Sequence, residues 1–103
     1  MTNPNIEVFQ KAIERDPGNT FARYAIAMEY RKLKQYDESL AAFADTSEHD
    51  PNYISAYQMG GQTAVDADRK ELAREMLEKG IEVAREQGND HAASEMTELL
   101  DSI

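Results

Sequence analysis

The chain contains no cysteine, which excludes disulfide bonds, thiolate zinc sites and a cysteine nucleophile. It also lacks any apolar run near the roughly 20 residues that a membrane-spanning helix needs. Residues 1–5 carry neither the basic start nor the apolar stretch of a signal peptide. Because the length of 103 residues suits one domain, we expect a single soluble domain located in the cytoplasm.

Basic residues are scarce in this chain. Eleven Lys and Arg stand against twenty Asp and Glu, for a formal charge of −9, so phosphate backbones would be repelled. We therefore expect no nucleic-acid partner and no membrane partner. Two explanations of the acidity stay open, namely mutual repulsion that keeps the protein soluble and attraction to a basic partner.

Residues with catalytic or metal-binding chemistry are also few. The two histidines, His49 and His91, do not share a metal-ligand spacing, and Gly60-Gly61 lacks the spaced glycines and lysine of a phosphate loop. Carboxylate pairs are common in so acidic a chain, but a catalytic pair needs a pocket that separates two pKa values, which short exposed helices seldom provide. We expect no enzyme activity, no metal and no cofactor.

A period of 34 residues runs through the sequence. The pair Asp16-Pro17 recurs as Asp50-Pro51, and large Phe43 matches large Leu77 at the same offset. Small residues match small residues in the same way: Ala22, Ala27, Ser39 and Thr46 match Ala56, Gly61, Ala73 and Gly80. A small–large–small alternation on one face allows two helices to pack closely, so the period predicts stacked helices.

Apolar residues recur at intervals of three and four, which predicts about six helices and no strand. The first helix is expected over residues 4–16, with Pro4 in its first turn, and the fifth is expected to end at Gly88 in a left-handed conformation. The expected capping residues are Asn19, Asp37, Asn52, Asp68 paired with Glu71 in a capping box, and Asn89 or Asp90.

This pattern resembles the tetratricopeptide repeat, in a small protein of the bacterial type. The positions that match its order of large, small and proline residues are Ile26, Ala27, Tyr30, Tyr36, Ser39, Phe43, Thr46 and Pro51, then Tyr57, Gly61, Ala64, Ala73, Leu77 and Gly80. The resemblance implies an all-α, right-handed solenoid of helical hairpins. Its parts would be a half-repeat helix (4–16), repeat one (17–50), repeat two with an extended second helix (51–87) and a capping helix (89–103).

Some residues depart from the family pattern. Lys34 and Asp68 replace the usual turn glycine, so we expect those two turns to be shaped differently, because a left-handed conformation costs a non-glycine residue roughly 1 kcal/mol. Arg23 stands where a large apolar residue is usual, and Gly60 stands where leucine is usual. We expect Gly61 to allow close helix packing and Gly60 either to pack or to leave a dent.

The resemblance also implies a concave groove, lined by the first helix of each repeat, that binds a peptide or helix of another protein. The residues expected to line it are Phe21, Tyr24, Met28 and Arg31 on one helix and Ser55, Gln58, Gln62 and Val65 on the next. Aromatic rings and methionine provide adaptable apolar contact, the glutamines can bind a peptide backbone, and Arg31 can meet a carboxylate.

Two alternatives stay open at this point. Phe21, Tyr24 and Met28 can instead be ordinary core beneath the first helix. The protein can also be a structural module that forms a homodimer through an apolar patch on that helix, built from Ile6, Phe9 and Ile13.

Overall fold

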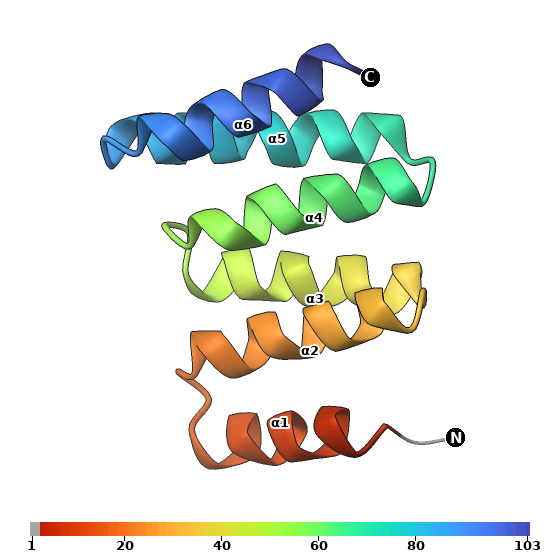
Figure 1. Ribbon diagram of the computed structural model, residues 1–103. Helices are drawn as coiled ribbons and strands as arrows, with labels where there is room; N and C mark the ends of the chain where they lie inside the picture. Colours follow the sequence, from red (N-terminus) through yellow and green to blue (C-terminus); the bar gives the residue numbers. More distant parts are fainter. Residues whose placement is uncertain (1–2) are drawn as a thin grey trace.

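The computed structural model describes residues 3–103 and contains six helices within that range, so the all-α prediction is confirmed. The helices are α1 (Pro4–Arg15), α2 (Thr20–Lys32), α3 (Tyr36–His49), α4 (Ile54–Asp66), α5 (Lys70–Glu86) and α6 (Asp90–Asp101). They stack in chain order, with α1 at one end and α6 at the other (Figure 1). None of these helices is both long enough and apolar enough to cross a membrane.

Four of the predicted helix boundaries are confirmed. The Asn19 side chain accepts a hydrogen bond from the Ala22 N–H, and Asn89 accepts one in the same way at the start of α6. Helix α1 begins at Pro4, and Gly88 follows α5 with φ +72°. These features depend only on residues within one turn of the boundary, which is why residue type predicts them.

Three predicted caps are wrong. Helix α3 begins one residue before Asp37, whose carboxylate lies in the first turn, and α4 follows Tyr53, so Asn52 lies in the preceding turn. The capping box is wrong because Asp68 is left-handed (φ 58°) and ends the turn after α4. Backbone hydrogen bonds close the turns before α3 and α5, and before α4 the Asp50 carboxylate also accepts the Asn52 N–H.

The turns at Lys34 and Asp68 keep the left-handed conformation, contrary to the expectation that they differ. Lys34 has φ 59°, and the next residue, Gln35, donates its N–H to the Tyr30 carbonyl at 2.9 Å. The Arg69 N–H donates to the Ala64 carbonyl at 2.8 Å after Asp68. This bond from the residue after the left-handed one closes the helix end and offsets the local strain.

The core forms two connected clusters between successive helices. The first is centred on Phe43, which is fully buried between α2, α3 and α4, and the second on Leu77 and Met96 between α4, α5 and α6. Gly61 is needed for close approach, since a Cβ there would lie 2.5 Å from Leu77. Gly60 is also buried and packs against Met76, so it leaves no exposed dent.

An ion pair connects α2 to α3 at the place where an apolar residue was expected. Arg23 Nη1 lies 2.6 Å from Asp45 Oδ2, and Nη2 donates to the Pro17 carbonyl at 2.8 Å. The Tyr57 hydroxyl, one period later, donates to the equivalent Pro51 carbonyl at 2.9 Å. Two different side chains thus support the same turn in the two hairpins. The Arg23 side chain is only 11% exposed, and Asp45 supplies its counter-charge.

Asp45→Ala should lower the free energy of unfolding by about 1–2 kcal/mol, because it leaves a nearly buried guanidinium without its counter-charge. Denaturant unfolding followed by circular dichroism measures this. The control is Glu48→Ala, which removes an exposed carboxylate from the same helix and should change stability by less than about 0.5 kcal/mol. Equal losses in the two variants would show that the Arg23 pair adds nothing.

Candidate functional site

The predicted groove residues lie on two neighbouring surfaces. We call Phe21, Tyr24, Met28 and Arg31 the α2 strip, and Ser55, Gln58, Gln62 and Val65 the α4 strip. Both sets occupy helix positions that are exposed or half-buried, as residues on one helix face should. Phe21 is the one large apolar residue of the two strips that is exposed, at 63%.

The two strips meet through Tyr24 in the middle of the surface. Its ring lies 5.8 Å from that of Phe43 and 5.4 Å from that of Tyr53, between centroids. Burial raises the pKa of Tyr24 above its usual 10.0, and Tyr53 raises it further, while Arg31 and Ser55 lower it. The phenol is therefore neutral at physiological pH.

Phe21 does not lie beneath the first helix. Its ring packs edge-on against Phe9, with centroids 6.4 Å apart and planes at 83°, and the rest of it is exposed. Met28 is half-buried against the cluster that contains Phe43. The apolar surface of the α2 strip is therefore partly buried at Met28 and exposed to solvent at Phe21.

Arg31 is held by α4. Its Nη1 lies 2.8 Å from Asp66 Oδ2 and donates to Thr63 Oγ1 at 3.0 Å. The Gln62 amide donates to the other Asp66 oxygen at 3.1 Å. The polar end of the site is therefore a network within the chain, and the Arg31 guanidinium already has the carboxylate that we expected a partner to supply.

The residues predicted for self-association do not form the exposed apolar patch that was expected. Ile6 is 6% exposed and packs inside the protein, so it cannot form a surface patch. Phe9 and Ile13 are half-buried, whereas their neighbour Val8 is 61% exposed. Val8 gave no signal in the sequence because it falls between the apolar positions that point towards α2.

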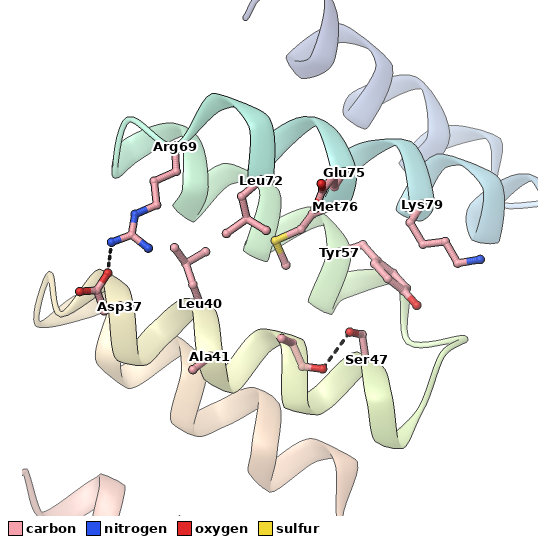
Figure 2. A pocket seen from close by; sticks show the side chains of 11 residues that line it. Asp37, Leu40, Ala41, Ser47, Tyr57, Arg69, Leu72, Glu75, Met76 and Lys79 are labelled. Atoms are coloured by element: carbon pink, nitrogen blue, oxygen red, sulfur yellow. Dashed lines mark hydrogen bonds and ion pairs between the residues drawn. The ribbon is translucent and has the colours of Figure 1, made fainter.

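A separate apolar cleft of about 400 Å³ lies between α3 and α5 (Figure 2). Leu40, Leu72 and Met76 form its walls, and Tyr57 closes it from α4. Tyr57 lies roughly 80–160° around α4 from the four residues of the α4 strip, so the cleft opens on a different side of that helix. The sequence did not predict it, because its apolar lining residues, such as Leu40, Leu72 and Met76, each have the pattern of core when taken alone.

Several polar side chains around this cleft bond to other groups of the same chain. Arg69 bonds Asp37 at one end, and the Ser47 hydroxyl donates to the Ala44 carbonyl at 3.0 Å (Figure 2). Within residues 3–103, no three His, Asp or Glu side chains come together as a metal site would require. The arrangement on both faces offers apolar contact and hydrogen bonds for recognition.

The comparisons with known proteins agree with this architecture. A family model described as tetratricopeptide repeat matches residues 8–41. A tetratricopeptide repeat domain protein from Salinibacter ruber is 36% identical, with a TM-score of 0.76, over 84% of this chain and 88% of that one. No curated protein sequence matches the chain.

Two further solved structures share the fold. The TPR2B domain of yeast Sti1, solved as a complex with pHsp70, has a TM-score of 0.85 at 23% identity, over 92% of this chain and 76% of that one. YrrB, described as a TPR protein with an unusual peptide-binding site, has a TM-score of 0.75 at 29% identity, over 90% of this chain and 46% of that one.

Proposed function

Because the chain belongs to the tetratricopeptide repeat family, we propose that it binds a short peptide or helix of another protein on the surface formed by the α2 strip and the α4 strip. In this proposal, residues 1–103 are one interaction domain without catalytic activity, and the hairpins α2/α3 and α4/α5 are its full repeats. The observation that carries it is the exposed apolar edge of the α2 strip, where Phe21 is 63% exposed beside half-buried Tyr24 and Met28.

Two structures of the same fold support a role in binding a protein or peptide. The yeast domain is a complex with pHsp70, and YrrB has a peptide-binding site. A helical-repeat scaffold places successive helices side by side and so presents a continuous surface to an extended partner.

The side chains of the two strips indicate which groups of a partner they could bind. Arg31 and Gln62 are occupied by Asp66, so a terminal carboxylate of the partner is not the anchor in this proposal. The free groups are the open face of Phe21, the half-exposed Met28 and the amide of Gln58. Aromatic and thioether groups adapt to apolar side chains, and the amide can pair with a peptide backbone.

Tyr24→Ala combined with Met28→Ala should weaken partner binding at least about tenfold, since buried aromatic contacts dominate such interfaces. Quantitative pull-down from cell extract, followed by titration of the captured protein, measures this. The control is Val8→Ala with Leu33→Ala, which removes exposed apolar groups outside the strips and should leave binding unchanged.

Tyr24 also packs on Phe43, so a second variant separates binding from folding. Phe21→Ala removes a ring that is 63% exposed and should weaken binding while the helical circular dichroism and unfolding midpoint stay close to wild type. Undiminished binding by both the double variant and Phe21→Ala would show that this surface is not the binding site.

A further inference from the structure

An open cleft of about 440 Å³ lies beside α6 at the end of the stack. We call its lining residues the α6 seat: Arg85, Asp90, Ala93, Ser94, Thr97 and Glu98. The asparagine caps align α6 with α2, since Asn19 and Asn89 accept the same hydrogen bond 70 residues apart. The seat can therefore be compared with α2 position by position.

The equivalent residues of α2 hold another helix. Ala93, Ser94 and Thr97 correspond to Arg23, Tyr24 and Ala27. All three contact α3. Arg23 pairs with Asp45, the Tyr24 ring packs on Phe43, and the Ala27 carbonyl accepts a hydrogen bond from Ser39 Oγ at 2.8 Å. The α6 seat thus lies where the second helix of a hairpin would pack against the first. No helix in the described part of the chain occupies this place.

Helix α1 carries the matching surface. Asn5, Phe9 and Ala12 lie 34 residues before Ser39, Phe43 and Thr46, which are all 0% exposed to solvent. In α1 the first of these positions is exposed and the other two are half-buried, and Val8 between them is 61% exposed. Only α2 packs extensively against α1 within residues 3–103.

The charges of the two surfaces are complementary. Helix α6 contains Asp90, Glu95, Glu98 and Asp101 but no Lys or Arg, and the one basic residue of the seat, Arg85, belongs to α5. On α1, Lys11 and Arg15 follow Val8 by one and two turns, are exposed, and form no ion pair with the residues that the structure describes. Glu7 and Glu14 lie within about 60° of Lys11 around the helix, but they correspond to Ala41 and Glu48 of α3, which are both exposed.

We propose that α1 of one copy packs on the α6 seat of a second copy as α3 packs on α2. By the correspondence with α3, Phe9 would pack on Ser94 and Lys11 would lie over Ala93, with Val8 beside Phe9 at the edge of the contact. The basic side chains of α1 would face the carboxylates of α6. Each copy then uses two different surfaces, so the contact is heterologous and extends head to tail instead of closing a dimer.

The association should be weak. A contact made through one helix buries far less area than a stable interface needs. Thr97 is also larger than Ala27 and Gly61 at the equivalent positions, which prevents the closest approach of the helices. Salt should weaken the association further by screening the charge pairs.

Sedimentation equilibrium of this chain tests the proposal. At low salt the average mass should rise from 11.6 kDa in dilute solution to at least twice that value at about 1 mM, where weak contacts become populated. Val8→Glu, which puts a carboxylate against α6, and Ser94→Arg, which blocks the seat, should each remain monomeric. Both positions are exposed, so folding should survive.

The decisive sample is an equal mixture of the two variants. One intact α1 and one intact seat remain in it, so it should form a two-chain complex and nothing longer. The control Ala41→Arg, exposed on α3 and outside both surfaces, should associate like wild type. A wild-type chain that stays monomeric at about 1 mM would overturn the proposal, as would single variants that still associate or a mixture that stays monomeric.

Discussion

Phe43→Ala should remove a large part of the free energy of unfolding of the protein. The side chain is 0% exposed and packs between α2, α3 and α4, beside the Tyr24 ring and the backbone of Gly60. Removing a buried phenylalanine ring costs about 3–5 kcal/mol, from lost burial and from the cavity left behind. A domain of this size is stable by only about 5–15 kcal/mol in total.

Denaturant unfolding monitored by circular dichroism measures the loss. Phe21→Ala is the matched control, because it removes the same ring from a position that is 63% exposed, and it should cost less than about 1 kcal/mol. Similar losses in the two variants would mean that Phe43 is not the centre of the core that α2, α3 and α4 share.

Gly80→Val should destabilise the protein by about 3 kcal/mol, because the new side chain has no room. A Cβ at this position would lie 2.6 Å from both Met96 Sδ and the Tyr57 Cβ. The methionine can move, but the Tyr57 Cβ is fixed to the backbone of α4. Valine forms helix better than glycine by less than about 1 kcal/mol, so the clash outweighs that gain.

The same thermal or denaturant measurement on Gly18→Val provides the control. Gly18 lies in the turn before α2, where the nearest atom to an added Cβ is Asp16 Oδ1 at 3.5 Å, so little change is expected. A Gly80→Val variant as stable as wild type would show that α5 can move away from α4 and α6 at little cost.

Much of the fold could be predicted from residues that are neighbours in the chain. The six helices follow from apolar spacing, and the boundaries at Pro4, Asn19, Gly88 and Asn89 follow from residues that satisfy or end a helix locally. The wrong caps have a common cause. Asp37, Asn52 and Asp68 are favourable capping types, but the turns before these helices are closed by backbone bonds from the N–H groups of Gln35, Tyr53 and Arg69.

The candidate site was less predictable. The sequence predicted that the members of each strip share one helix face, because they are spaced three and four residues apart. It could not show that Arg31 pairs with Asp66, since that contact joins residues 35 positions apart on different helices. Nor could it show that Ile6 is covered while Val8 is exposed, which depends on how α1 rotates against α2.

The sequence by itself therefore determined the helices, the 34-residue period and the family, because each rests on residue type and spacing. Tertiary structure decided which apolar residues are exposed, which charged groups are free and where the clefts lie. The physical reason is that these properties depend on distances between helices. Such distances are set by the volumes of side chains such as Phe43, Leu77 and Gly80 packing together, and not by any one segment.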